Sequence, residues 1–261
     1  MKIYISADIE GISGVSTWQE ADMMGSPEAR RRMTQEVKAA CVAAYEAGAT
    51  EIMVKDGHGY GKNINHEELP LGVKLISGWS NHPYNMFEGL DDSYSGVILI
   101  GYHSGASKHT SPLAHTMDRS INYIKINNVV SSEFSIYATL AHSLKVPVVT
   151  VTGDGGLIRE VIDFDPNIEI VAVQEGFGGA VISIHPKLAC QYIKNAVTKG
   201  IEKIGTYEFK TENMYELEIS FKNHKDAYKY SFFPNVEQIG SHEVKLQTND
   251  YFEILRFLVF V

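Results

Sequence analysis

Cysteine is scarce in this sequence, with only Cys41 and Cys190 among 261 residues. Small secreted domains that depend on disulfides carry many more cysteines in much shorter chains. Both cysteines fall in stretches whose pattern is typical of helices. The scarcity argues against a disulfide framework and predicts a reducing compartment, which we take to be the cytoplasm.

The sequence also lacks long basic runs and long hydrophobic runs. The longest run of Lys and Arg covers residues 30–32, and the formal net charge is −9. Nucleic-acid binding depends on a concentrated basic surface, so we expect no nucleic-acid partner. Residues 254–261 are mostly apolar, but a bilayer-spanning helix needs about 20 such residues. No secretory signal pattern is present either, and we therefore expect no membrane association.

What the sequence does contain is an alternation of apolar strands and helical stretches. Continuously apolar strands separated by helices indicate an α/β fold with a mostly parallel sheet covered on both faces. From about residue 205 the pattern changes, and residues 215–221 alternate polar and apolar side chains as in a half-exposed antiparallel strand. The sequence predicts an α/β metal-binding catalytic domain over residues 1–205. It predicts a small α+β subdomain over 206–261, which serves either oligomerisation or the substrate side. The expected strands cover residues 2–7, 50–55, 96–101, 146–151 and 168–173, and the expected helices 27–47, 133–144 and 186–203.

Acidic and histidine side chains follow three of these strands. The first strand is followed by Asp8 and Glu10, the second by His58 and the third by His103. Because ligands bind beyond the carboxyl ends of parallel strands, these side chains should meet at one edge of the sheet. Two carboxylates on one face repel each other unless they are protonated or bridged by a cation, and histidine is a usual partner of zinc. The spacing alone does not separate a metal centre from helix-capping or turn residues.

Several motifs, taken in order, resemble the zinc-dependent D-aminopeptidases of the DppA type. Residues 6–11, which read Ser-Ala-Asp-Ile-Glu-Gly, resemble the opening signature of that family. The resemblance covers about residues 1–200, and the ordered combination of motifs makes it specific. It continues through residues 55–58, 88–92, 101–103, 114–117, 127–133 and 153–154.

The resemblance implies a centre with two zinc ions per chain, and it implies that His115 is the catalytic side chain beside the metals. From the residues alone, Glu133 is also a residue favoured at a helix N-terminus, and His115 is also interpretable as a polar histidine of a surface loop. The ligand set itself admits zinc, manganese or cobalt. The implied ligands are Asp8, which would bridge the two ions, Glu10, His58, His103 and Glu133.

The resemblance further implies a metallo-aminopeptidase that removes the N-terminal residue, a D-amino acid, from short peptides or amino-acid amides. It also implies a homodecamer, so the expected partners are the substrate and further copies of the chain. Two alternatives stay open. One is a metal-dependent hydrolase of another class, a phosphoesterase, and the other is a metal-stabilised assembly protein without turnover.

Overall fold

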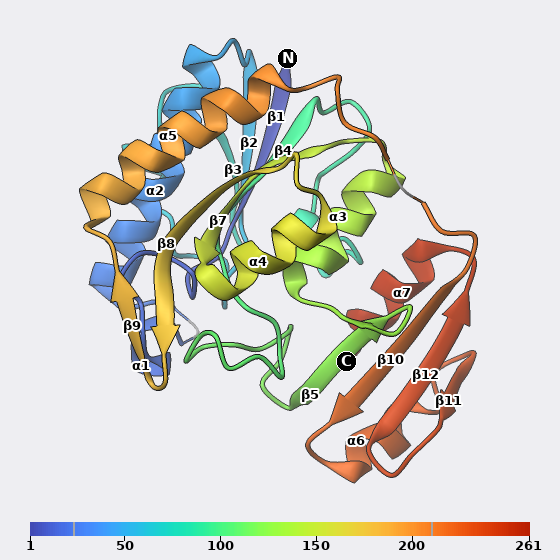
Figure 1. The fold of residues 1–261 in the computed structure, drawn as a ribbon. Coiled ribbons are helices and arrows are strands. Elements are labelled where there is room, and N and C mark those ends of the chain that lie inside the picture. The colour runs from blue at the N-terminus through green and yellow to red at the C-terminus, as the bar shows by residue number, and fades with distance from the viewer. Residues whose placement is uncertain (23, 210) are drawn as a thin grey trace.

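The larger of two sheets forms the centre of the molecule in the computed structural model, which describes residues 1–22, 24–209 and 211–261 (Figure 1). Its strand order is β3-β2-β1-β4-β7-β8-β9. All neighbouring strands are parallel except β8 and β9, which are antiparallel. The predicted α/β class with a mostly parallel sheet is confirmed. The strands are β1 (Lys2–Ala7), β2 (Glu51–Asp56), β3 (Lys74–Ile76), β4 (Gly96–Tyr102), β7 (Val148–Asp154), β8 (Glu169–Phe177) and β9 (Ala180–Ser183).

Helices cover both faces of this sheet. Figure 1 shows α2 (Pro27–Glu46) and α5 (Pro186–Glu202) together on one face, and α3 (Glu133–Ser143) and α4 (Gly155–Phe164) on the other. The central strands β1, β4 and β7 are buried along nearly their whole length, which agrees with the predominantly apolar sequences of β1 and β4. In the part of the chain that the structure describes, no helix combines the length and the apolarity needed to cross a membrane.

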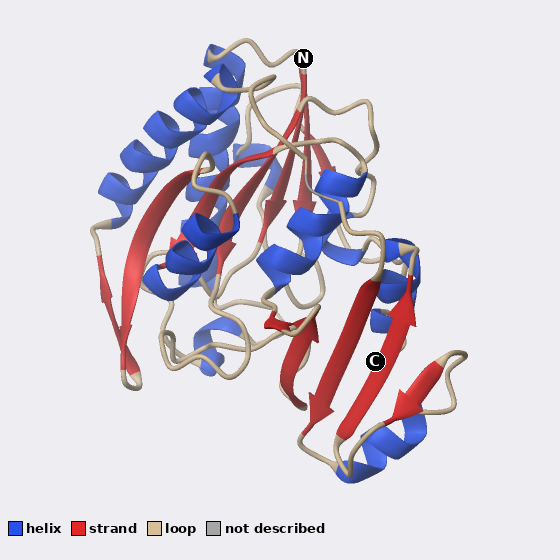
Figure 2. Ribbon diagram, turned by 45° about the vertical axis from the view of Figure 1, so that its right-hand side comes forward, coloured by secondary structure: helices blue, strands red, loops and turns tan. Residues whose placement is uncertain are grey.

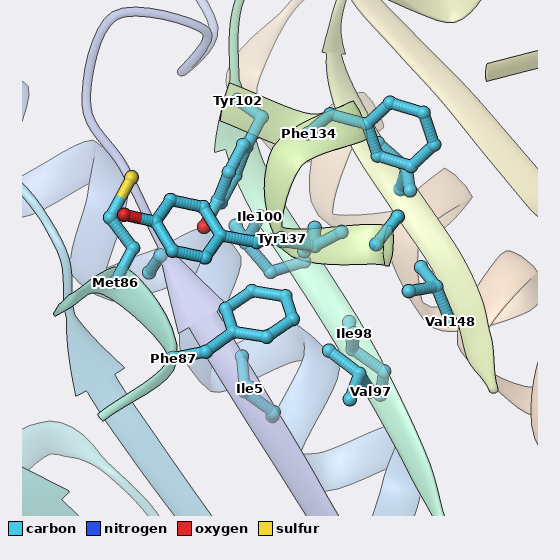
Figure 3. Close-up of a cluster of buried hydrophobic side chains, with 14 of the residues drawn as sticks. Ile5, Met86, Phe87, Val97, Ile98, Ile100, Tyr102, Phe134, Tyr137 and Val148 are labelled. Atoms are coloured by element: carbon cyan, nitrogen blue, oxygen red, sulfur yellow. The ribbon is translucent and has the colours of Figure 1, made fainter. Parts of the chain in front are cut away.

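Aromatic side chains pack together with aliphatic ones in the core between β1, β4 and α3 (Figure 3). Phe87 stacks on Tyr137 of α3 with ring centroids 5.2 Å apart, and it contacts Tyr4 of β1 at 5.8 Å. The buried Tyr4 hydroxyl donates to the Glu88 carbonyl at 2.7 Å, which compensates the burial of a polar group. Each aromatic pair of this kind contributes about 0.5–1.5 kcal/mol beyond the area that it buries. The cluster fixes α3, and with it Glu133 at the first turn of the helix, against the sheet.

The second sheet is antiparallel, with strand order β11-β12-β10-β5-β6 (Figure 2). The strand predicted at residues 215–221 is present as β10. Two strands, β5 and β6, come from the middle of the chain, so the sheet is built from two distant segments. The division of the chain into domains at residue 205 stays a prediction. The remaining elements are β5 (Ile121–Ile126), β6 (Val129–Val130), β10 (Tyr215–Phe221), β11 (Val236–Gln238), β12 (Glu243–Thr248), α1 (Trp18–Ala21), α6 (His224–Tyr230), α7 (Tyr251–Leu258) and the 3-10 turns His66–Glu68 and Asn85–Phe87.

Glu36 of α2 is a buried acidic residue that supports the segment after β1. Its side chain accepts hydrogen bonds from the Ser13 N–H at 3.0 Å and the Ser13 hydroxyl at 2.6 Å. Its second carboxylate oxygen is buried and has no hydrogen-bond partner in the described part of the chain. Burial outweighs the two hydrogen bonds and raises the pKa of Glu36 from 4.5 to about 7. The link between helix and segment therefore depends on a carboxyl group that titrates near neutral pH.

We expect the stability of the Glu36→Gln variant to rise relative to that of the wild type as the pH rises from 4.5 to about 7. The folded wild type binds the Glu36 proton more tightly than the unfolded chain does, so its stability falls across this window and levels off above it. The difference in the free energy of unfolding between the two proteins should change by roughly 3 kcal/mol, since one pKa unit corresponds to about 1.4 kcal/mol. Urea unfolding at a series of pH values measures it.

The matched control is Glu46→Gln, which removes an exposed carboxylate from the same helix. Its stability difference from the wild type should stay nearly constant over the same range. A pH-independent difference for Glu36→Gln would contradict the raised pKa.

Candidate metal centre

The predicted site residues meet where three neighbouring strands of the parallel sheet end. Ala7, at the end of β1, pairs with Asp56 of β2 on one side and with Ile100 of β4 on the other. The chain order reverses between β1 and β4, because β2 and β3 lie on one side and β4 and β7 on the other. Such a switch point leaves a crevice beyond the carboxyl ends of the strands. The residues brought there are Asp8 and Glu10 after β1, His58 after β2 and His103 after β4.

Close backbone packing fixes the segment that follows β1. The Asp8 N–H donates to the Ile100 carbonyl at 2.8 Å, and the Gly11 N–H donates to the Gly101 carbonyl at 2.8 Å. A Cβ atom on Gly11 would lie 1.8 Å from the Tyr102 carbonyl oxygen, so only glycine fits there. Gly101 has a φ of +72°, which also favours glycine. The carboxylates after β1 are therefore held across the end of β4.

Asp8 lies at the centre of the cluster and faces two histidines with its two oxygens. Asp8 Oδ1 lies 3.3 Å from His58 Nδ1, and Asp8 Oδ2 lies 3.4 Å from His103 Nε2. Each of these histidines faces one further carboxylate. Glu10 Oε2 lies 3.0 Å from His58 Nδ1, and Glu133 Oε2 lies 3.2 Å from His103 Nε2. All five side chains are buried, and they form two half-sites that share Asp8.

Backbone carbonyls hold the outer nitrogen of both histidines. His103 Nδ1 donates to the Ser104 carbonyl at 3.0 Å, and His58 Nε2 donates to the Ala21 carbonyl. Because a carbonyl oxygen only accepts, these nitrogens carry the hydrogen, and the other nitrogen of each ring faces the carboxylates. Histidines that bind metals are oriented in this way, with the second N–H on a carbonyl or carboxylate.

Either protons or metal ions must balance the charge of this cluster. Burial opposes the charged form of His58, but Glu10 and Asp8 outweigh it and raise its pKa to about 11. Burial likewise opposes the charged form of His103, whose pKa Glu133 and Asp8 raise well above its usual range. Burial and the charge of Asp8 raise the pKa of Glu10. A cluster that perturbs so many groups at once is typical of a functional site.

The donor set fits a pair of metal ions. Glu10 Oε2 and His103 Nε2 are buried without an aligned hydrogen-bond partner among the residues described. Ligand atoms of Asp8, Glu10 and His103 lie within 4.8 Å of one another, and so do those of His103, His115 and Glu133. Imidazole nitrogen and carboxylate oxygen are the donors that zinc takes in hydrolytic sites. Metal ions would satisfy the same atoms that otherwise need extra protons.

His115 lies at the edge of the cluster, where it stacks on His103. The two ring centroids are 4.3 Å apart and the rings are nearly parallel, at 5°. His115 Nδ1 donates to the Leu113 carbonyl at 3.0 Å, so in the neutral ring Nε2 is the nitrogen without a hydrogen, and it lies 3.8 Å from Glu133 Oε1. Its side chain is 14% exposed, against 1% for His103. The geometry leaves His115 able either to bind a metal or to carry a proton at the edge of the cluster.

A cavity of about 290 Å³ opens onto the cluster. Its lining includes two tryptophans, Trp18 and Trp79, and three charged side chains that the sequence analysis did not single out. Trp18 meets the ring of His115 edge to face, with centroids 5.1 Å apart. Two of the three charged residues lie within four positions of His115 in the sequence. This proximity is the one sequence feature that could have indicated them. The three charged residues are Asp22, Asp118 and Arg119.

Two carboxylates outside the cluster support it. Asp56 accepts the N–H groups of Asn63 at 2.6 Å and Ile64 at 2.8 Å, which shapes the loop that carries His58. Asp154 caps α4 and accepts the Ser104 N–H at 2.6 Å. Asp154 thereby fixes the segment directly after His103. Both carboxylates belong to motifs of the family resemblance, and both position other residues.

Comparison with known proteins gives one consistent result. The chain matches the sequence profile of the peptidase M55 family, described as D-aminopeptidase, over residues 1–260. It is 30% identical to a D-aminopeptidase of Bacillus subtilis (strain 168) over 258 residues, which cover 97% of this chain and 93% of that protein. The structure is similar to that of the Zn-dependent D-aminopeptidase DppA from Bacillus subtilis, a self-compartmentalizing protease. The TM-score is 0.93 at 28% identity, with 100% of this chain and 96% of that chain covered.

Zinc should raise the melting temperature of the protein, because the cluster that would hold it exists only in the folded chain. At a free zinc concentration of about 100 times Kd, the gain is about 2.7 kcal/mol per site. Asp8→Asn should lose most of this gain, since Asp8 faces both histidines. Calorimetry with zinc and with a chelator measures the difference.

Asp118→Asn is the matched control, because Asp118 lines the same cavity outside the cluster. This variant should keep the full response to zinc. An equal response of Asp8→Asn and the wild type would contradict a metal centre built around Asp8.

Proposed function

The chain belongs to the peptidase M55 family of D-aminopeptidases, which are hydrolases acting on peptides, and we propose that it is a two-zinc aminopeptidase. It removes an N-terminal D-amino acid from short peptides or amino-acid amides. The observation that carries this proposal is the position of Asp8, whose two oxygens each face a different histidine. A carboxylate placed in this way would be shared by the two ions of a two-metal hydrolase.

Five residues of this chain would hold the two ions, with Asp8 between them. His58 and Glu10 would bind on one side of Asp8, and His103 and Glu133 on the other. The similar Bacillus subtilis structure is that of a Zn-dependent enzyme, which supports zinc as the metal. The chemistry that zinc supplies in two-metal hydrolases is polarisation of the scissile carbonyl and a lowered pKa of the attacking water.

His115 acts at the edge of the centre in this proposal. Its Nδ1–H is held by the Leu113 carbonyl, so the tautomer is fixed and Nε2 is free to accept a proton. Nε2 takes this proton from the attacking water and passes it to the amine that leaves when the peptide bond breaks. Trp18 packs edge-on against the ring and restrains its orientation. A protonated His115 also stabilises negative charge that develops on the carbonyl oxygen.

Carboxylates in the same cavity suit the free amine of a substrate. Asp22 and Asp118 line the cavity but lie outside the metal cluster. Their charges favour an N-terminal ammonium group at the centre, and this preference makes the enzyme an exopeptidase. The same acidic lining disfavours a phosphate ester, because the substrate of a phosphoesterase would bring further negative charge to these carboxylates.

Assembly into a homo-oligomer is part of the proposal. The similar Bacillus subtilis protein is a self-compartmentalizing protease, a type of enzyme that encloses its active sites by assembly. A decamer, as the sequence resemblance implies, is the form that we expect for this chain. Such an enclosure would admit short peptides and exclude folded proteins.

His115→Ala should lower kcat by about 10²–10⁴-fold, the usual loss when a proton-transfer or charge-stabilising group is removed. We expect the variant to retain two zinc ions per chain. Release of p-nitroaniline from D-alanine and L-alanine anilides measures the activity and the stereochemical preference, and elemental analysis measures the metal.

His109→Ala is the matched control, since His109 is an exposed histidine of the same loop. Loss of zinc together with activity in His115→Ala would identify His115 as a ligand. Full activity with both metals bound would refute a catalytic role. A zinc-loaded wild type that hydrolyses neither anilides nor short peptides would refute the proposed function.

A further inference from the structure

A second cavity adjoins the metal cavity and shares a wall with it. The second cavity measures about 480 Å³. Trp18, His115 and Arg119 line both cavities and form the shared wall. The outer walls of the second cavity come from the loop after β4, from the start of β5 and from Lys222 after β10. The two cavities therefore lie side by side, with the proposed catalytic histidine between them.

The lining of the two cavities is opposite in charge. Arg119 is the single Lys or Arg side chain that lines the metal cavity, among the residues described there. The second cavity is lined by Arg119 and Lys222, and no acidic residue is found among its described lining residues. A basic pocket beside an acidic one stands out in a chain whose formal net charge is −9. The carboxylates of the metal cavity are Asp8, Glu10, Asp22, Asp118 and Glu133.

Arg119 is held in place while its hydrogen-bonding groups stay available. Its guanidinium lies over the Trp18 ring, 4.6 Å from the centroid, in a cation–π contact. Its Nη2 atom lies 3.5 Å from Asp22 Oδ1, which is an ion-pair contact longer than a good hydrogen bond. The planar group offers five N–H donors, and its fork shape matches a carboxylate. Trp18 therefore orients a carboxylate-binding group that, apart from the long ion pair with Asp22, donates no hydrogen bond to the described residues.

Lys222 reaches the same cavity from the second sheet. It follows β10 at the point where the register between β10 and β5 shifts, at Ser220 and Phe221. The Lys222 N–H donates to the Ser120 carbonyl at 2.7 Å, which ties it to the residue after Arg119. Its side chain is exposed and lines the second cavity. The backbone thus presents two basic side chains, far apart in sequence, to one cavity.

We propose that the second cavity is a subsite for the C-terminal carboxylate of a short peptide, bound by Arg119 and Lys222. This inference rests on the proposed aminopeptidase function. A short peptide carries a positive charge at one end and a negative charge at the other, and the two cavities match these ends in order. The amine lies at the acidic metal cavity, and the carboxylate lies beyond His115 in the basic one. The enzyme should therefore prefer peptides with a free carboxylate to the corresponding amides.

The test compares D-alanylglycine with D-alanylglycinamide, which differ in the charge at the C-terminus. The protein used is the full-length, zinc-loaded form. We expect the kcat/KM of the wild type to be about tenfold or more higher for the free acid, because hydrogen bonds to a charged group contribute this much to binding. The difference should lie mainly in KM. Arg119→Gln and Lys222→Gln should each reduce this preference severalfold, and Arg119→Lys should retain part of it.

Lys225→Gln is the matched control, because it removes the same charge from an exposed lysine of α6 that lines neither cavity. Its preference for the acid should equal that of the wild type. Lys222 is exposed, so its substitution tests the subsite even where Arg119→Gln disturbs Trp18. Equal hydrolysis of acid and amide by the wild type, or an unchanged preference in both Gln variants, overturns the subsite and leaves the aminopeptidase intact. Hydrolysis of neither compound overturns the proposed function as well.

Discussion

Three buried carboxylates have to be accommodated together at the end of the parallel sheet. Asp8, Glu10 and Glu133 are all less than 5% exposed, and a buried carboxylate without a partner costs several kcal/mol. The strands on either side of β1 each contribute one histidine, and each histidine faces Asp8 and one glutamate. The cluster is therefore complete only when β2, β1 and β4 are adjacent and in register, so that the sheet itself sets the distances. A catalytic centre held by strand ends is more rigid than one carried by loops alone.

The residues around the cluster can be understood as supports for this arrangement. Asp154 fixes the segment after His103, and Asp56 shapes the loop that carries His58. Glu36 holds the segment after β1 through Ser13. Each support is itself a carboxylate, buried and bonded to backbone N–H groups. The region thus places carboxyl groups in two layers, and divalent ions at its centre would relieve the repulsion within the inner layer.

The sequence predicted the parts of this site that depend on local pattern. Apolar strands followed by Asp8, His58 and His103 predict where each side chain emerges, and parallel strands bring such ends to one edge. No local sequence pattern predicts that β2, β1 and β4 are neighbours in the sheet. Glu133 and His115 were reached through the family resemblance, since one starts a helix and the other lies in a long loop. The strand β5 was missed because its partner, β10, lies about 90 residues later, and the two-residue strand β6 pairs with β5. Arg119 was missed because its contact with Trp18 joins segments that are far apart in the chain.

The position of β5 and β6 connects the second sheet to the chemistry. The chain leaves the cluster at His103, lines the second cavity, forms β5 and β6, and returns to the cluster at Glu133. The segment between His103 and Glu133 contains His115 and Arg119, and the pairing of β10 with β5 holds this segment in place. The parallel sheet thus sets the side chains of Asp8, Glu10 and His58, which follow β1 and β2. The antiparallel sheet sets the side chains that would meet the substrate beyond the scissile bond. Changes in the second sheet can therefore alter which peptides are accepted while the histidines and carboxylates at the strand ends keep their geometry.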